Sequence, residues 1–290
     1  MKPLHILMSI AVTFIWGAHY AVAKVGMAEI PPFLFGLLRY FFAVFPLIFW
    51  VKKPEGLSWK VIIPLSLLMS VVSTSLLLFG IKSGISSGLA SIVAQTQVIF
   101  TVILSRIYFK SRLSALQIIG ICVALFGIFI ISAEQEISIE EASFMGIFFI
   151  LMGAFAWAIS NTFFRYIKQP KPFNFVIWMG IVPPLPFFLL SLTFEGPDLM
   201  LQSLSHMTGA GIFAIAFSII CSTWIATPLW VRLFKTYDPA VIAPYSLMIP
   251  VFGMSLSYFA LGEVYTPLSI AGCVCIFLGL VLNQWKSAQN

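Results

Sequence analysis

Two glutamines lie in the middle of an apolar stretch, and the chemistry of their amides needs an explanation. The stretch "SGLASIVAQTQVIFTVILS" spans residues 87–105 and carries Gln95 and Gln97. An amide buried in hydrocarbon without a hydrogen-bond partner is destabilising. It is tolerated where it bonds a neighbouring helix, or where it lines a cavity and bonds a polar ligand.

Aromatic and polar side chains at helical spacing offer a second kind of chemistry. Trp16 and Tyr20 lie four residues apart with His19 next to Tyr20, and Trp157 and Asn161 are four apart as well. Residues four apart share one face of a helix. A face that joins an aromatic ring to a polar group suits a cavity for a small metabolite, whereas the alternative is packing in the core.

Composition identifies the elements that must position these residues. Of the 290 residues, 60% are hydrophobic and 9% are charged, whereas about a quarter of a soluble domain is charged. Such a chain has too little polar surface to cover a globule, so we expect an integral membrane protein with the lipid bilayer as its surroundings. The four cysteines lie in apolar runs and predict neither a disulfide nor a metal site, and no cofactor is expected.

Ten apolar runs are long enough to cross the bilayer, which takes about 20 residues per helix. They cover residues 4–24, 33–51, 61–81, 87–108, 113–132, 143–164, 173–194, 209–231, 240–261 and 267–285. The first run has an alternative as a cleaved signal peptide, because Lys2 precedes it and "AVA" at 21–23 resembles a cleavage site. Its length and its Trp, His and Tyr residues favour a retained span.

The placement of charge predicts the orientation of the spans. With both termini in the cytoplasm, 13 of the 16 Lys and Arg residues fall in inner segments, and eight of the ten Asp and Glu residues fall in outer connections. The positive-inside rule requires this distribution. The net charge of +6 is therefore a topology signal, and we expect no binding to nucleic acid.

Two internal matches predict a repeat. "FIWGAHYAVAK" (14–24) aligns with "FAWAISNTFFR" (155–165) at an offset of 141, and "LQIIGICVALFG" (116–127) aligns with "LSIAGCVCIFLG" (268–279) at an offset of 152. Halves of five spans each cross an odd number of times, so they must have opposite orientations, as in many transporters. The predicted fold is an all-α membrane protein whose ten transmembrane helices form two inverted five-helix repeats, residues 1–135 and 143–286.

Four segments carry a resemblance to a known family. "WGAHYAVAKVG", "SGLASIVAQTQVIFT", "WAISNTF" and "APYSLMIPVFG" resemble the EamA branch of the drug/metabolite transporter superfamily, and the likeness covers almost the whole chain. It implies an exporter of the bacterial inner membrane that works by alternating access around a central cavity. The implied lining comes from spans 1, 3, 4, 6, 8 and 9, with spans 5 and 10 behind it.

Within the superfamily the likeness is to exporters of O-acetylserine and cysteine, which implies a small-molecule substrate of that kind. Export of other metabolites or drugs is the alternative. The sequence departs from the pattern at "KSR" (110–112), where Gly-Glu-Arg is usual, and at His19, where these exporters carry Asn. The second departure falls on a candidate site residue and bears on the identity of the substrate. A homodimer is compatible with the sequence.

Helical geometry separates the two glutamines, because positions two apart differ by about 200° around a helix. Ser91 shares a face with Gln95, and Thr101 shares another with Gln97. Gln95 lies about 12 Å into its span at 1.5 Å per residue, close to the midplane. We expect Gln95 to face the cavity and Gln97 to bond a neighbouring helix.

Few groups inside the spans can titrate or carry charge. The absence of Asp and Glu there argues against coupling through carboxylates. His19 is a candidate proton carrier, and the alternative is a neutral histidine that bonds a neighbour. Arg39 lies about 9 Å inside the second span, and Lys82 ends the third. Each either anchors to the interface or a carbonyl, or attracts a substrate carboxylate.

The ninth span contains two prolines, Pro244 and Pro250, within "DPAVIAPYSLMIPVFG". Proline removes a backbone hydrogen bond and kinks a helix. Freed carbonyls are tolerated in a membrane where they meet protein or a wet cavity. We expect a bent gating element beside Tyr245 and Ser246 of the substrate site, with a static kink as the alternative.

An enzyme is the rival class. "GISSG" (84–88) matches Gly-x-Ser-x-Gly, and an intramembrane serine protease would use such a serine. That chemistry needs a histidine within hydrogen-bond reach of Ser86, and the motif lacks its strand–turn–helix setting. A structural or lipid-handling membrane protein is a further alternative. We therefore expect a transporter and no catalytic residues.

Overall fold

Proline sets many of the helix starts in this chain, because its missing N–H has no partner in the first turn of a helix. The structure is a computed structural model, and it describes residues 1–45, 47–55, 57–83, 93–110, 114–133, 143–166, 171–261 and 266–285. The helices that begin at a proline are α1 (Pro3–Met27), α2 (Pro32–Val44), α9 (Pro172–Met179), α10 (Pro184–Phe194), α11 (Pro197–Ser205), α14 (Pro239–Ile242) and α16 (Pro267–Trp285).

The remaining helices begin at other residues, some of them capped by a hydroxyl such as that of Thr208. They are α3 (Trp59–Ser66), α4 (Ser73–Lys82), α6 (Gln97–Phe109), α7 (Ala115–Ala133), α8 (Ser143–Phe164), α12 (Gly209–Phe217), α13 (Thr227–Thr236) and α15 (Ile249–Leu261), with a short 3₁₀ turn η1 (Leu47–Phe49). No β-strand occurs in the described part of the chain.

Seven helical segments of the described chain are long and apolar enough to cross a membrane. They are Pro3–Met27, Pro32–Phe49, Trp59–Gly80, Met145–Phe164, Pro172–Phe194, Gly209–Thr236 and Pro239–Leu256. Three shorter apolar helices accompany them, at Val93–Phe109, Ala115–Ile130 and Ile270–Leu282. Large apolar side chains face outward along these helices, for example Phe126 and Leu185. The expectation of an all-α, multi-pass membrane protein is confirmed.

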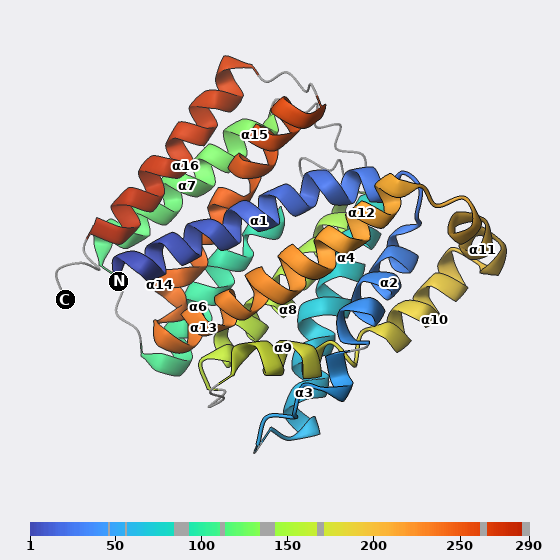
Figure 1. Cartoon of the computed structure of the whole chain (residues 1–290). Helices are drawn as coiled ribbons and strands as arrows, with labels where there is room; N and C mark the ends of the chain where they lie inside the picture. Colours follow the sequence, from blue (N-terminus) through green and yellow to red (C-terminus); the bar gives the residue numbers. More distant parts are fainter. Residues whose placement is uncertain are drawn as a thin grey trace.

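The helices pack as one bundle, and a pair of helices forms one of its edges (Figure 1). α7 and α16 lie side by side at that edge and contact each other along their lengths. α1 crosses the middle of the bundle and packs against α12 on one side and α15 on the other. α8 packs against α4 and α6, and α2 packs against α10.

Spans are numbered below by the order of the ten apolar runs in the sequence. Two of these predicted spans, the third and the eighth, change from α-helix to π-helix near their middle. The third span contains η2 (Leu67–Val72) between α3 and α4, and the eighth contains η3 (Ser218–Ala226) between α12 and α13. Each has a proline nearby, Pro64 before η2 and Pro228 after η3. Because a proline cannot donate to the carbonyl one turn earlier, the ladder of hydrogen bonds changes register around it. π-helical turns are frequent at functional sites, which directs attention to these two segments.

The ninth span is interrupted at the prolines that the sequence singled out. A 3₁₀ segment, η4 (Ala243–Met248), separates α14 from α15, with Pro244 inside it and Pro250 in the first turn of α15. The fourth span is interrupted as well, because a turn at Thr96 separates a short helix from α6. α6 begins at Gln97 and α15 at Ile249, an offset of 152.

The seventh span and the connection after it also differ from simple expectation. Residues 180–183 form a turn that divides the predicted run 173–194 into α9 and α10. Prolines 183 and 184 account for the division, because neither has an N–H to continue the helix. The connection between the seventh and eighth spans contains the exposed helix α11, where the sequence indicated only a loop.

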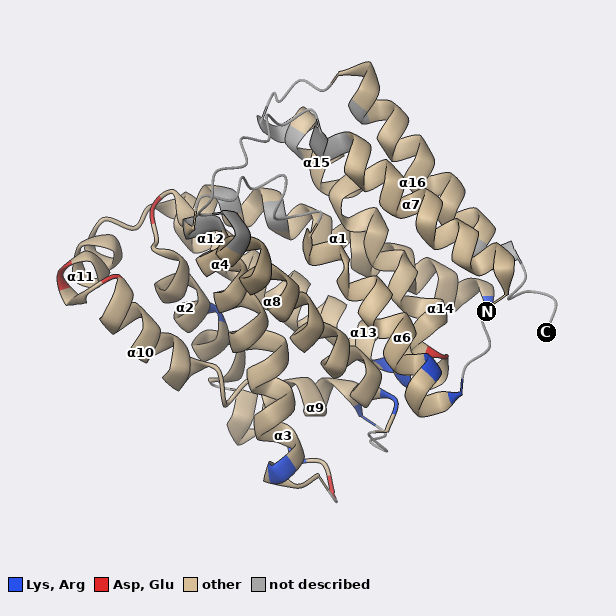
Figure 2. Cartoon of the chain, turned by 180° about the vertical axis from the view of Figure 1, so that it is seen from behind, with Lys and Arg blue, Asp and Glu red and all other residues tan. Residues whose placement is uncertain are grey.

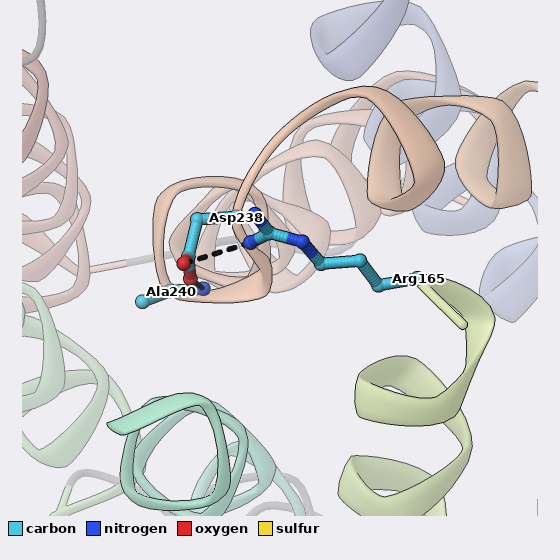
Figure 3. A network of polar contacts seen from close by, with 3 residues as sticks. All are labelled: Arg165, Asp238 and Ala240. Atoms are coloured by element: carbon cyan, nitrogen blue, oxygen red, sulfur yellow. Dashed lines mark hydrogen bonds and ion pairs between the residues drawn. The ribbon is translucent and has the colours of Figure 1, made fainter. Parts of the chain in front are cut away.

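The two ends of the bundle carry opposite charge. Lys and Arg gather at the end formed by α3, α9 and the C-terminal end of α6, where acidic residues such as Asp238 lie among them, whereas the charged residues around α11 at the opposite end are Asp and Glu (Figure 2). At the basic end, Arg165 after α8 donates to Asp238 at 2.8 Å, and the same carboxylate accepts from the N–H of Ala240 at the start of α14 (Figure 3). The half-exposed ion pair contributes about 0–1 kcal/mol.

Two carboxylates tie helices together at the acidic end. Glu29, just after α1, accepts from the N–H and the hydroxyl of Thr208, which begins α12. Glu195, just after α10, accepts from the N–H groups of Phe33 and Leu34 at the start of α2. Helix N-termini carry unpaired N–H groups and a partial positive charge, so each carboxylate stabilises the start of a helix from the other half of the chain.

Candidate functional site

A cavity of about 290 Å³ lies among the helices. Its size is near the lower end for small-molecule sites, which run from about 300 to 1,000 Å³. Residues of α1, α2, η2, α4, the fourth span, α8, α9, α10, η3 and α13 line it, together with Ile249 of α15. None of the lining residues that the structure describes comes from α7 or α16.

Aromatic rings form one part of the cavity lining. The rings of Trp16 on α1 and Trp157 on α8 meet edge to face, with centroids 6.0 Å apart. Behind them, the fully buried Trp230 on α13 packs against Trp16 at 5.1 Å. The Nε1 of Trp230 donates to the Oδ1 of Asn161 at 3.2 Å. Three helices are therefore joined at this point by rings and one buried hydrogen bond.

A basic pair forms another part of the lining. The Nε2 of His19 on α1 lies 2.9 Å from the hydroxyl of Ser218, which gives its own hydrogen to the carbonyl of Ala214. Ser218 therefore accepts from His19, and a neutral His19 ring carries its proton on Nε2. Arg39 on α2 donates from Nε to Thr223 and from Nη2 to Ser222, at 3.3 and 3.2 Å.

The π-helix η3 brings these hydroxyl partners to the cavity. Thr223 donates to the carbonyl of Ser218, and Thr227 donates to the carbonyl of Ser222, each five residues back. These bonds add a side-chain donor to carbonyls of the π-helix, and the carbonyl of Ser222 also accepts from the backbone N–H of Thr227. The hydroxyl oxygens of Ser222 and Thr223 then remain as acceptors for Arg39.

The two glutamines form a third part of the lining. Gln95 and Gln97 both border the cavity, and the Oε1 atom of each is buried without a hydrogen-bond partner among the described residues. The structure differs here from the expected division, in which Gln97 bonds a neighbouring helix. Between the two residues the helix tightens, because the N–H of Thr96 donates to the carbonyl of Val93 three residues back and not four.

Comparison with known proteins identifies the family. The profile of the EamA-like transporter family matches residues 3–133 and 144–285. The chain belongs to the EamA-like transporter family. Two relatives are named "Probable amino-acid metabolite efflux pump": one from Salmonella typhimurium, 34% identical over 95% of this chain and 93% of its own, and one from Escherichia coli, 31% identical over 97% and 96%.

A solved structure described as "Crystal structure of protein" shares the fold of this EamA-like chain. It superposes with a TM-score of 0.84 over 100% of this chain and 99% of its own, at 16% sequence identity. A likeness at that identity shows the fold alone. The family makes the chain a transporter, and the cavity is the candidate for its substrate site.

Four of the sequence-predicted site residues meet at the cavity of this EamA-like transporter: Trp16, His19, Gln95 and Trp157. Asn161 is buried behind the lining and bonds Trp230. Tyr245 and Ser246 are buried in η4, where the hydroxyl of Ser246 donates to the carbonyl of Ala243. The roles of all these residues in binding stay predictions.

Other predictions fall on parts of the chain outside the description. The side chains of Tyr20 and Lys82 are not among those described, and neither are Ser86 and the rest of "GISSG". Pro244 lies inside the 3₁₀ segment of the ninth span and Pro250 lies just after it in α15, and their role in gating stays a prediction.

Lining residues on several helices were not predicted from the sequence, and hydroxyl groups of the third and eighth spans are among them. These hydroxyl groups belong to Ser70, Ser73, Thr74, Ser222, Thr223 and Thr227. The resemblance implied that these two spans line the cavity but not which faces do so. A signal was present, because serines and threonines recur in otherwise apolar stretches at "SVVSTS" (70–75) and "CSTWIAT" (221–227). Among the described residues, no three His, Cys, Asp or Glu side chains gather at one place.

Proposed function

We propose that this chain exports amino acids or amino-acid metabolites of the cysteine and O-acetylserine kind. The observation that carries the proposal is a cavity lined by basic, amide, hydroxyl and aromatic groups in a chain of this family. The names of the relatives from Salmonella typhimurium and Escherichia coli support the substrate class. The cavity volume of about 290 Å³ suits a small solute.

The transporter is built from ten spans in two inverted halves, residues 1–135 and 143–286. Three observations support this. The family profile matches two separate stretches of the chain. α6 and α15 each have 13 residues, α7 and α16 each have 19, and the starts within each pair differ by the same offset of 152. The third and eighth spans each contain a π-helix.

The protein lies in the bacterial inner membrane with both termini in the cytoplasm. The segregation of Lys and Arg to one end of the bundle supports this orientation, because cytoplasmic connections are enriched in basic residues (Figure 2). Export would then proceed from the end at α3 and α9 to the end at α11.

Alternating access requires that the two halves move around the cavity. The irregular helices of the fourth and ninth spans are suited to this, because a helix bends where its backbone hydrogen-bond ladder is interrupted. Pro244 and Pro250 would fix where the ninth span bends. The carboxylate bonds of Glu29 and Glu195 join the ends of helices at the acidic side, and opening toward that side would have to break them.

The proposal is tested by efflux. Cells that overexpress the protein should tolerate higher concentrations of toxic thiol amino acids and retain less labelled cysteine after preloading. Trp16→Ala and Gln95→Ala should each reduce this efflux several-fold at equal protein levels. Unchanged efflux in both variants would remove these residues from the substrate site, and no efflux in the wild type would overturn the substrate class.

Transport is either facilitated or coupled to protons through His19. His19 contacts Ser218 of η3, so a change in its protonation would reach the π-helix that lines the cavity. Efflux into everted vesicles with and without a pH gradient separates the two modes. Uphill transport that survives in His19→Gln would exclude His19 as the proton carrier.

A further inference from the structure

Arg39 is the one charged side chain among the described residues that line the cavity. A guanidinium in a membrane interior ordinarily pairs with a carboxylate or with backbone carbonyls. Among the described residues Arg39 has neither, because no Asp or Glu lines the cavity and its two acceptors are hydroxyls. The ring of Tyr40 lies 5.1 Å from its central carbon and stabilises the charge only in part. The cavity therefore has a net positive charge at one place.

The hydrogen bonds of Arg39 leave room for a ligand. A guanidinium has five N–H donors. Among the described residues two acceptors take one each, the neutral hydroxyls of Thr223 and Ser222. Both bonds are long, and three donors remain, with at least one on each terminal nitrogen. That arrangement fits a carboxylate, which binds a guanidinium through two parallel bonds.

The two glutamines have hydrogen-bond acceptors without donors, whereas Arg39 has donors without acceptors. Gln95 is 7% exposed, and its Oε1 has no donor among the described residues. The Oε1 of Gln97 is in the same state, and both residues border the same cavity as Arg39. A buried carbonyl oxygen without a donor is unfavourable unless a ligand supplies one. The ammonium group of an amino acid carries three donors and a positive charge.

We infer that the cavity binds a zwitterionic α-amino acid, with its carboxylate on Arg39 and its ammonium group on the Oε1 atoms of Gln95 and Gln97. The inference rests on the exporter function proposed above and assigns the chemistry of its substrate. The unpaired donors and the unpaired acceptors are then satisfied by a single ligand. Trp16 and Trp157 border the same space and are available to the ligand's side chain.

A competing role for Arg39 is to hold η3 in place through Ser222 and Thr223. The two roles predict different specificity. A residue that only supports η3 affects every ligand of the site in the same proportion. A residue that binds the carboxylate affects only ligands that have one.

The test compares three thiols that differ only in their charged groups: cysteine, cysteamine, which lacks the carboxylate, and 3-mercaptopropionate, which lacks the ammonium group. Each competes with labelled cysteine for binding to the purified protein under reducing conditions. In the wild type, cysteine should compete at least about tenfold better than either analogue, because each analogue loses charge-assisted hydrogen bonds. This comparison needs no variant and is independent of folding effects.

The variants should then show crossed effects. Arg39→Gln should abolish the preference for cysteine over cysteamine but keep the preference over 3-mercaptopropionate, and the double variant Gln95→Leu/Gln97→Leu should do the reverse. Arg39→Lys, which keeps the charge but not the planar fork, should weaken the first preference less. Ser222→Ala/Thr223→Val tests the competing role, because it removes the contacts of Arg39 to η3, and it should change the affinities for the three thiols in the same proportion.

Three results would overturn the inference. They are equal competition by the three thiols in the wild type, parallel losses in Arg39→Gln, or loss of the cysteamine discrimination in Ser222→Ala/Thr223→Val. Cysteine efflux that persists without discrimination would overturn the inference and leave the exporter function standing. Failure of all three thiols to bind, with no cysteine efflux, would overturn both.

Discussion

Gly127 of α7 lies directly against the backbone of Gly272 of α16. A Cβ built on Gly127 would sit 2.5 Å from the carbonyl oxygen of Gly272, which is closer than real Cβ atoms approach. The relationship is reciprocal, because a Cβ on Gly279 would meet the carbonyl oxygen of Gly120 in the same way. Gly127 and Gly279 are equivalent in the sequence repeat, as are Gly120 and Gly272. The repeat therefore exchanges the two glycine contacts, and this supports the two-fold relation proposed for the two halves.

Side chains at these glycines should therefore be destabilising. Gly127→Val and Gly279→Val should each lower the stability of the purified protein by about 1–3 kcal/mol, because α7 and α16 would be forced apart. The measurement is thermal unfolding in detergent. Gly209→Ala is the control, since nothing lies within 4 Å of a Cβ there. Equal melting temperatures for all three variants and the wild type would contradict the packing of these helices.

The sequence predicts α7 and α16, the pair at the edge of the bundle, because the signals for these helices are local. A run of about 20 apolar residues predicts a span without knowledge of its neighbours. The repeat at 116–127 and 268–279 identified both helices of the paired edge and the glycines at their contact. The breaks in the ninth span were signalled by Pro244 and Pro250, since proline acts on its own backbone.

The details of the cavity were not predictable, because they depend on breaks that have no strong sequence signal. The helix tightens at Thr96 inside the fourth span without a proline or glycine beside it, and both Gln95 and Gln97 border the cavity there. The π-helix of the eighth span, which places Ser222 and Thr223 against Arg39, was not predicted from the sequence, because a proline such as Pro228 signals a break without its geometry. Helical-wheel reasoning fails wherever the helix is irregular, and here that happens at the cavity.

Replacement of a glutamine by leucine should separate function from stability. The Oε1 of Gln97 is buried without a partner among the described residues, so Gln97→Leu removes an unsatisfied acceptor. We expect the variant to be as stable as the wild type or up to about 1–3 kcal/mol more stable, while cysteine efflux falls. Paired melting and efflux measurements on the same preparation check this.

A purely structural role for Gln97 predicts the opposite result. If the amide joined two helices, Gln97→Leu would lower the melting temperature and leave efflux per folded molecule unchanged. Thr101→Val is a useful control on the same helix, because the Thr101 hydroxyl donates only to the carbonyl of Gln97 within α6. It should change neither efflux nor the response to the glutamine substitution.

The buried bond between Trp230 and Asn161 should contribute to stability in a pairwise manner. Asn161→Ala leaves the Trp230 N–H without its acceptor, which should cost about 1–3 kcal/mol. Trp230→Phe removes the donor but keeps an apolar ring. In Asn161→Ala/Trp230→Phe the loss should be smaller than the sum of the single losses by about 0.5–1.5 kcal/mol.

This cycle also distinguishes packing from substrate contact for Asn161. A coupling energy near zero would mean that Asn161 does not stabilise the fold through Trp230, and its effect on efflux would then have to arise elsewhere. The readout is unfolding of the four proteins by heat or denaturant under one set of detergent conditions. Efflux by the double variant, scaled to folded protein, shows whether the geometry around Trp16 survives.

The link between Glu29 and Thr208 should make stability depend on pH. The hydroxyl of Thr208 donates to the Glu29 carboxylate at 2.7 Å, the N–H of Thr208 donates at 3.0 Å, and the N–H of Gly211 adds to them. These bonds lower the pKa of Glu29 from its ordinary value of 4.5. A group with a lowered pKa stabilises the folded state above its ordinary value and loses that effect as the pH falls through the lowered one.

Glu29→Gln should therefore melt below the wild type at neutral pH, and the difference should shrink as the pH is lowered from 5 toward 3. Asp198→Asn, a change at an exposed carboxylate at the start of α11, controls for the loss of one negative charge. A wild-type advantage over Glu29→Gln that stays constant over this pH range would mean that the carboxylate is not bonded to Thr208 in its charged form.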